Sequence, residues 1–328
     1  MKTEIALTGT PQERAETVAR AVTLLRAGEV VALPTETVYG LAADALSDEA
    51  VVKIFETKER PRFDPLIVHL PERSWLERVT VSDESTSALI EKLIAAFWPG
   101  PLTMVLPRSE MVPSLVTAGL TTVAVRMSAH PVFSAVVRAF GRPLAAPSAN
   151  RFGRISPTSA ADVAEELSGR IRLIVDGGAT EHGIESTVIA RRDGGIEILR
   201  EGPITREELS KFGELRQRSS IPMASPGQLP SHYRPQTPLL IADNVARISV
   251  PVGKRYGALR WGSSSIAGGF VESRQLSSKQ DLREAAANLF RFLRELDHAG
   301  LDQIVAEALP EEGLGAAIMD RLRRAAHS

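Results

Sequence analysis

The chain has 328 residues, of which 43% are apolar and 24% charged, proportions that are typical of soluble globular proteins. Its 39 basic and 40 acidic residues nearly cancel, so no overall positive charge favours nucleic acid, and any RNA contact needs a local patch or another protein. The absence of cysteine excludes disulfides, zinc sites built from thiolates and a cysteine nucleophile.

The amino-terminal segment 1–17 has no apolar stretch of the kind that a secretory signal contains. No run of apolar residues approaches the length that spans a bilayer. We therefore expect a soluble protein in the cytoplasm, without membrane contact.

The first predicted element is a helix with a clear beginning and end. Thr10 and Glu13 fit a capping box around Pro11, and Gly28 follows the last turn. The pattern then predicts strands at 29–35, 65–70, 102–108, 121–128, 142–147 and 171–178, and helices at 48–58, 84–97, 130–141 and 159–168.

A hairpin with arms 185–192 and 196–202 follows, turned at residues 193–195. Thr205 and Glu208 cap a short helix after it. Alternating strands and helices predict an α/β domain, and the terminal hairpin indicates a mixed rather than an all-parallel sheet.

The alternation stops at residues 213–238, which are rich in Pro, Ser and Gly, and we interpret them as an interdomain linker. It then resumes, with strands expected at 238–243, 255–261 and 301–309 and helices at 279–300 and 313–328. We therefore predict a first domain at 1–212 and a small Rossmann-like α/β domain at 239–328.

Common catalytic and nucleotide-binding motifs are absent from the sequence. It has neither a P-loop nor a G-x-G-x-x-G turn after a strand. It also lacks H-E-x-x-H and G-x-S-x-G, which argues against a zinc hydrolase and a serine hydrolase.

Many polar side chains instead lie at the ends of predicted strands, where α/β proteins place their ligand crevices. They are rich in cations and hydroxyl groups and poor in carboxylates, which suits a polyanionic ligand held by charge-assisted hydrogen bonds. The set comprises Thr35, Glu36, Thr37, Lys58, Arg60, Asp64, His69, Arg126, Ser148, Asn150, Ser186, Thr187 and Arg200.

Each of these residues also has an ordinary structural explanation. Lys58 and Arg60 can complement the dipole of the preceding helix, and Asp64 can begin a turn. His69 can be a hydrogen-bonded histidine of the core. Arg126 is harder to explain in this way, because a buried guanidinium without an ion-pair partner is costly.

The same applies to three residues outside this set. Thr122 can be a strand former, Thr158 a helix cap and Tyr233 a packed aromatic residue. Taken singly, no residue decides between structure and function.

Taken together, the segments resemble one family. ALPTETVYGLAADA, KERPRFDPLIVHL, FWPGPLTMVL, VAVRMSAHPVF, PLAAPSANRFGRISPT, GIESTVI and ILREGPIT occur in the order of the YrdC-like threonylcarbamoyl-AMP synthases. The linker sequence SHYRP and the ending GLGAAIMDRLRRAA are similar to the longer, two-domain form. The resemblance covers nearly the whole chain, and its most specific part is Lys58-x-Arg60 together with Ser148-x-Asn150.

The resemblance implies a fold and an activity. The fold would be a twisted mixed sheet of the YrdC-like (DHBP-synthase-like) type, followed by the Rossmann-like domain. The activity would be that of a nucleotidyltransferase that condenses L-threonine, bicarbonate and ATP into L-threonylcarbamoyladenylate and pyrophosphate, with Mg²⁺ accompanying the ATP. A separate transferase complex would then modify the tRNA adenosine next to the anticodon, and direct tRNA contact is at most weak.

The resemblance also implies roles for individual residues. Lys58 and Arg60 would be catalytic. Contacts to L-threonine are implied for Thr37, His69, Arg126, Ser148 and Ser186. Contacts to ATP are implied for Arg60, Asp64, Thr122, Asn150, Thr158, Arg200 and Tyr233. No protein side chain is expected to bind the metal, which would be held by the ATP phosphates.

One residue departs from the family pattern, which usually has Asn where this chain has Asp64. An anion near phosphates needs Mg²⁺, a ribose hydroxyl or a neighbouring arginine beside it. Tyr233, on the linker, is expected to fold over the nucleotide and exclude water.

Two other functions are compatible with the residues alone. One is an RNA-binding factor that uses the basic concavity without chemistry, which the near-neutral composition disfavours. The other is a carbamoyl-transferring relative that acts on a different amine.

Overall fold

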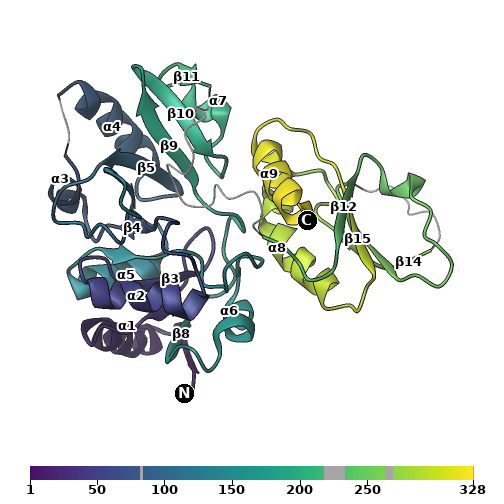
Figure 1. The fold of residues 1–328 in the computed structure, drawn as a ribbon, viewed down its shortest axis with the longest axis horizontal. Coiled ribbons are helices and arrows are strands. Elements are labelled where there is room, and N and C mark those ends of the chain that lie inside the picture. Colours follow the sequence, from purple (N-terminus) through teal and green to yellow (C-terminus); the bar gives the residue numbers. More distant parts are fainter. Residues whose placement is uncertain (82–83, 218–232, 263–268, 328) are drawn as a thin grey trace. The chain divides into compact units, whose positions relative to one another are not determined.

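The computed structural model describes residues 1–81, 84–217, 233–262 and 269–327 (Figure 1). Contacts divide the chain into two compact units. Unit 1 comprises residues 1–152, 157–180 and 185–228, and unit 2 comprises residues 153–156, 181–184 and 229–328.

Unit 1 alternates strands and helices along most of its length. Its elements are β1 (Glu4–Leu7), α1 (Pro11–Arg26), β2 (Val31–Leu33), β3 (Gly40–Asp44), α2 (Asp48–Lys58), β4 (Ile67–His69), η1 (Arg73–Trp75), α3 (Leu76–Val79), α4 (Glu84–Phe97), β5 (Leu102–Pro107), β6 (Thr122–Arg126), α5 (Pro131–Phe140), β7 (Leu144–Ala145), α6 (Ala160–Leu167), β8 (Leu173–Asp176), β9 (Thr187–Arg192), β10 (Gly195–Arg200), α7 (Arg206–Leu209) and β11 (Leu215–Arg216).

The strands of unit 1 form one mixed sheet in the order β1-β8-β2-β3-β7-β4-β6-β5-β9-β10-β11. Parallel pairs such as β4–β6 stand beside antiparallel pairs such as β5–β6. The predicted fold class, a mixed α/β sheet followed by a small α/β unit, is therefore confirmed.

Helices cover both faces of this sheet. Successive side chains of β2 point to opposite faces of the sheet. Val31 packs with residues of α1 and α5, whereas Ala32 belongs to the apolar cluster that includes residues of α2, α4 and α6. With apolar side chains buried on both faces, the sheet forms the centre of unit 1 and its strand ends are left to carry polar groups.

The predicted start of α1 is confirmed in detail. Thr10 Oγ1 accepts a hydrogen bond from the Glu13 backbone N–H, and the Glu13 carboxylate accepts one from the Thr10 N–H. The predicted helices at 48–58 and 84–97 are also confirmed at both ends.

Three strands of unit 1 were not predicted, namely β1, β3 and the two-residue β11. β1 has only four residues and leaves Ile5 and Leu7 exposed, so it lacks a clear apolar pattern. β3 has the sequence GLAAD, whose glycine and alanines are weak strand formers. It is nevertheless fully buried and pairs antiparallel with β2, so its place in the sheet overrides its propensity.

The predicted hairpin is confirmed as β9 and β10. Arg192 pairs with Gly195, which leaves Asp193 and Gly194 as a two-residue turn with φ of 47° and 76°. Positive φ at both positions is the requirement of the hairpin turn that Asp-Gly favours.

Unit 2 contains a small parallel sheet in the order β12-β15-β13-β14. Its elements are β12 (Leu239–Ala242), η2 (Val245–Arg247), β13 (Tyr256–Arg260), β14 (Phe270–Gln275), α8 (Leu282–Asp297), β15 (Gln303–Glu307) and α9 (Leu314–Ala326). All were predicted except η2 and β14, whose partly exposed residues lack an apolar period. An all-parallel sheet with helical crossovers has the predicted Rossmann-like layering.

Two short segments from the middle of the chain pack within unit 2. The Arg294 side chain on α8 donates to the Ile155 carbonyl at 2.8 Å. A Cβ on Gly183 would lie 2.5 Å from Cα of Ala287, so only glycine allows this approach to α8.

The predicted linker is only partly visible. Residues 218–232 lie outside the described part of the chain, whereas Leu215 and Arg216 form β11 and pair with β10. The exact domain boundaries at 212 and 239 stay a prediction.

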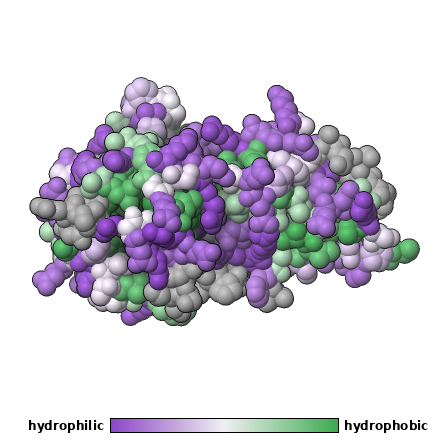
Figure 2. Space-filling view, turned by 90° about the horizontal axis from the view of Figure 1, so that it is seen from above, coloured by the Kyte–Doolittle hydropathy of each residue, from purple (hydrophilic) through white to green (hydrophobic). Residues whose placement is uncertain are grey.

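The helices of the described ranges include none that is long and apolar enough to cross a membrane. Polar and apolar side chains are interspersed on the face that Figure 2 shows.

Candidate active site

Lys58, the last residue of α2, is almost fully buried. Its Nζ donates to the carbonyl oxygens of Ser148 and Asn150, each at 2.5 Å, and so fixes the loop after β7 to the end of α2. Burial, and then the charge of Arg60, lower the pKa of Lys58 well below its usual value. The ammonium group is therefore held by backbone dipoles in a site with excess positive charge.

Arg60 lies just beyond α2 and forms a buried ion pair with Asp64. Arg60 Nη2 is 2.8 Å from Asp64 Oδ2, and the two side chains are 4% and 1% exposed. Arg60 also donates to the Pro65 carbonyl at 2.9 Å. Burial raises the pKa of Asp64, while the charges of Arg60, Lys58 and Arg200 lower it, and the net shift is upward.

Arg200 brings the hairpin to the same cluster. Arg200 ends β10, and its guanidinium donates to the carbonyl and the hydroxyl of Ser186, both at 3.0 Å. The Ser186 hydroxyl also shares a hydrogen bond of 2.8 Å with Thr103. The charges of Lys58, Arg60 and Arg200 all act on the Asp64 carboxylate. We call these four residues the cationic cluster.

Arg126, at the end of β6, is the centre of a second group. This Arg126 group also contains Glu36, Thr37 and Ser128. Its Nη2 lies 2.6 Å from Glu36 Oε1, its Nη1 donates to Thr37 Oγ1 at 3.0 Å, and its Nε donates to the Gly100 carbonyl at 3.3 Å. A guanidinium has five N–H groups. Among the described residues, one N–H on Nη1 and one on Nη2 therefore have no partner.

Glu36 is a member of this group that no sequence motif assigned to a ligand. Both carboxylate oxygens are used, one by Arg126 and the other by the Ser128 hydroxyl at 2.5 Å. Burial alone would raise its pKa, but the charge of Arg126 and these hydrogen bonds lower it to about 2. The only signal in the sequence was its position directly after a buried strand.

His69 lies beside Arg126 because β4 and β6 pair in that register. Its ring contacts Phe133 with a centroid distance of 4.7 Å. Burial, assisted by the charge of Arg126, lowers the pKa of His69 to about 3, so the imidazole is neutral at physiological pH. Its buried Nδ1 has no well-aligned hydrogen-bond partner within the described part of the chain.

The β4–β6 pair also connects the two groups. Ile67 is paired with Ala124 and His69 with Arg126. The Pro65 carbonyl, which accepts a hydrogen bond from Arg60, lies two residues before the start of β4. β4 therefore leads from the loop that binds Arg60 to the residue that lies beside Arg126.

Thr158 lies just before α6, and its hydroxyl donates to Asp162 Oδ2 at 3.1 Å. The N-cap of α6 is Ser159 and not Thr158, which the sequence had suggested as a possible helix cap. The Thr158 side chain is buried, and its backbone carbonyl accepts from Thr180.

Comparison with known families now decides what kind of protein carries this site. The Sua5/YciO/YrdC family model, described as "Telomere recombination", matches residues 23–202. A second model, "Threonylcarbamoyl-AMP synthase, C-terminal domain", matches residues 204–327. The chain belongs to the threonylcarbamoyl-AMP synthase family.

Relatives of this family match over nearly the whole length. A threonylcarbamoyl-AMP synthase of Pyrococcus abyssi is 41% identical over 93% of this chain and 92% of its own. One of Bacillus subtilis is 42% identical over 94% of this chain and 92% of its own. The crystal structure of P. abyssi Sua5 with L-threonine has a TM-score of 0.89 and 39% identity, over 99% of this chain and 98% of that one.

These findings confirm the family resemblance and the enzyme class predicted from the sequence, a threonylcarbamoyl-AMP synthase that acts as a nucleotidyltransferase. The contacts predicted for single residues are a finer statement and stay predictions.

Tyr233 lies in unit 2 and follows the other predicted site residues in the sequence. It is 1% exposed, has a φ of 65°, and stacks on Phe290 with ring centroids 5.3 Å apart. The Arg321 guanidinium lies 5.6 Å from the tyrosine ring centroid. The packed aromatic residue that the sequence allowed is thus found, while the predicted contact of Tyr233 with ATP in this family member stays a prediction.

Among the described residues, no group of three or more His, Cys, Asp or Glu could hold a metal ion. The carboxylate of the cationic cluster is held by Arg60.

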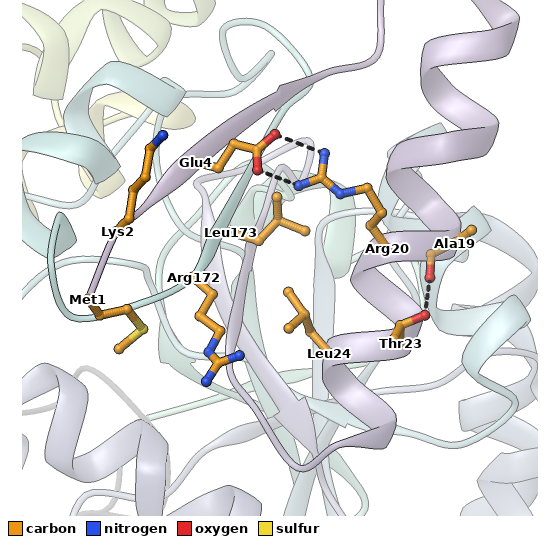
Figure 3. A pocket seen from close by; sticks show the side chains of 9 residues that line it. All are labelled: Met1, Lys2, Glu4, Ala19, Arg20, Thr23, Leu24, Arg172 and Leu173. Atoms are coloured by element: carbon orange, nitrogen blue, oxygen red, sulfur yellow. Dashed lines mark hydrogen bonds and ion pairs between the residues drawn. The ribbon is translucent and has the colours of Figure 1, made fainter.

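A shallow groove at the other end of the sheet is separate from this family's predicted site residues (Figure 3). It is lined by residues of α1, of the edge strand β1 and its preceding residues, and of the start of the neighbouring strand β8. Arg20 in this groove donates hydrogen bonds of 2.9 and 2.6 Å to the Glu4 carboxylate, which balances its charge.

Proposed function

We propose that this enzyme condenses L-threonine, bicarbonate and ATP into threonylcarbamoyl-AMP and pyrophosphate, for the threonylcarbamoyladenosine modification of tRNA. The product would pass to a tRNA threonylcarbamoyltransferase complex. The proposal includes a cytoplasmic location, in line with a sequence that contains no cysteine.

The observation that carries the proposal is the pairing of two buried groups with different chemistry. The cationic cluster has three positive side chains around one carboxylate, which suits a triphosphate. The Arg126 group has a guanidinium whose charge is balanced by an ionised carboxylate and whose remaining N–H groups suit a second, smaller acid.

Arg126 is suited to the carboxylate of threonine. Its two remaining N–H groups are on Nη1 and Nη2, the two nitrogens with which arginine grips a carboxylate. Glu36 and Thr37 fix the plane of the guanidinium before the ligand arrives. In this half of the proposed site, Thr37, His69, Ser148 and Ser186 would contact the other polar groups of threonine.

The reaction needs little help from a general base. The neutral amine of threonine and bicarbonate give a carbamate and release water, and the carbamate oxygen is already an anionic nucleophile. This oxygen attacks the α-phosphorus of ATP, a P–O–C bond forms, and the bond to the β-phosphate breaks so that pyrophosphate leaves with its electron pair. A neutral His69 would orient a substrate rather than transfer a proton.

The main obstacle is repulsion between the carbamate and the triphosphate. Lys58, Arg60 and Arg200 would offset this repulsion and hold the reacting groups in line. Mg²⁺, bound to the ATP phosphates, would supply further charge neutralisation. The arrival of a polyanion would also restore the proton affinity that burial takes from Lys58. The proposed ATP contacts are Arg60, Asp64, Thr122, Asn150, Thr158, Arg200 and Tyr233.

The direct test is pyrophosphate release with mass-spectrometric detection of the adenylate. We expect release only when L-threonine, bicarbonate and ATP are all present. Release that needs neither L-threonine nor bicarbonate would refute the proposal. A parallel reaction with L-serine tests the amine, because equal rates with serine and threonine would contradict the assignment of threonine.

Arg60→Ala tests the charge argument. We expect kcat/KM for ATP to fall by about 10²-fold or more, as for the loss of other groups that stabilise transition-state charge. Arg20→Ala is the matched control, because Arg20 is also ion-paired but its side chain is 48% exposed and belongs to the separate groove. Equal activity of the two variants would remove Arg60 from the mechanism.

A further inference from the structure

Asp64 is the carboxylate that faces the positive side chains of the cationic cluster. Its pKa responds to the charges of Arg60, Lys58 and Arg200. Glu166, another carboxylate whose charge reaches Lys58, is paired with Arg151 at 3.2 Å. Asp64 therefore occupies the place in the charge balance that a phosphate group of ATP would take.

The two partners of the ion pair are attached to the fold differently. The backbone N–H of Arg60 donates to the Phe55 carbonyl at 2.9 Å, which continues the hydrogen bonding of α2. The backbone N–H of Asp64 makes a longer bond of 3.3 Å to the Pro61 carbonyl, within the loop that joins α2 to β4. Arg60 is thus anchored to a helix, whereas Asp64 is held by a turn.

We propose that Asp64 competes with the phosphates of ATP for Arg60 and thereby sets how tightly this enzyme holds the nucleotide. The inference rests on the proposed function for the identity of the ligand. For Asp64 alone, it replaces the proposed contact with ATP by a role that opposes binding of the nucleotide.

The competition follows from the burial of the pair. At 2.8 Å, with both side chains almost fully buried, the attraction between Arg60 and Asp64 is screened little by water. A phosphate that approaches Arg60 must therefore displace the carboxylate or accept a negative charge beside it. The upward shift in the pKa of Asp64 shows that burial costs its charged form more than the cations return, which eases displacement by a more highly charged anion.

Asp64→Asn tests the proposal, because asparagine keeps the shape of the side chain and removes its charge. We expect ATP to bind roughly tenfold more tightly to the full-length variant by calorimetry, the effect of losing one nearby like charge. The KM for ATP should fall in step, while the KM for L-threonine stays unchanged. Asp64→Ser, measured in the same way, provides a second uncharged side chain if the asparagine variant does not fold.

Asp44→Asn is the matched control. Asp44 is also a buried aspartate of unit 1 paired with an arginine, Arg142, at 3.1 Å, and it is not part of the cationic cluster. This variant should leave the affinity for ATP unchanged. Only the aspartate of this pair is buried, since the Arg142 side chain is 47% exposed. The control therefore separates release of Arg60 from the general effect of removing the charge of a buried, arginine-paired aspartate.

Two results would overturn the inference. Unchanged ATP affinity in Asp64→Asn would make the pair purely structural. Weaker binding would make Asp64 a direct ligand of the nucleotide, and a loss confined to samples with Mg²⁺ would identify it as a metal ligand. Absence of ATP binding by the unaltered enzyme would instead refute the proposed function, so the two failures are distinguishable.

Discussion

Burial makes His69 a source of acid sensitivity. Its pKa in the folded protein is about 3, against an ordinary 6.5, so between these values the unfolded chain binds a proton that the folded protein excludes. The free energy of unfolding therefore rises with pH through this window. Above about pH 6.5 both states are unprotonated at His69, and this residue no longer makes stability depend on pH. The Glu36 carboxylate has a pKa of about 2, so the free energy of unfolding decreases further as the pH falls below about 4.5.

We predict that His69→Gln reduces this dependence. Between pH 5 and 6.5, the slope of unfolding free energy against pH should be lower than in the unaltered protein, by at most about 1.4 kcal/mol per pH unit. Urea unfolding at several pH values measures it, and the exposed His327→Gln serves as control. Identical slopes in all three proteins would contradict a neutral buried His69.

At this scale the sequence indicated that Arg126 needs a partner but did not identify the partner. Arg126 was expected to need a partner, and Glu36 was seen only as a polar residue after a strand. The two are joined because β6 and the loop after β2 meet in the folded sheet, across 90 positions of the chain. No local pattern encodes such a pairing, because it depends on the order of strands in the sheet.

The hairpin of β9 and β10 positions Ser186 and Arg200 through a close approach of its ends. Gly202 follows β10, and a Cβ there would lie 2.4 Å from the Thr187 backbone nitrogen and 2.7 Å from the Glu185 carbonyl. The backbone cannot yield at this point without moving Ser186.

We therefore predict that Gly202→Ala lowers the free energy of unfolding by about 1–3 kcal/mol, the usual cost of overpacking. Gly213→Ala is the control, because its Cβ would meet Ile196 at an ordinary 3.7 Å. Urea unfolding compares the two variants, and equal stability would show that the hairpin ends can separate freely.

The ends of helices were the most predictable features of the fold, because a cap depends on residues close together in the sequence. Thr10 and Glu13 at the start of α1 are an example. The strands β1 and β3 were missed for different physical reasons. One is a short edge strand with exposed side chains, and the other is built from residues whose burial, rather than propensity, makes them extended.

The whole molecule carries a formal charge of −1, and its positive side chains at the proposed site are buried rather than spread over a surface. Nonspecific RNA binding depends on surface cations that replace counterions on phosphates.

We predict that binding of tRNA to this protein is weaker than about 1 µM at physiological salt. Fluorescence anisotropy with labelled tRNA measures the affinity. Tight binding with a steep salt dependence would favour an RNA-binding role and contradict the expectation from charge.

The division of the chain between units has a consequence for its synthesis. Residues 153–156 and 181–184 belong to unit 2, yet they precede α8 and α9 in the chain. Ile155 and Ile184 are 3% and 0% exposed in the folded protein. Because a ribosome delivers residues in order, both isoleucines emerge before the helix against which their segments pack. The nascent chain therefore carries both isoleucines uncovered until the last hundred or so residues arrive.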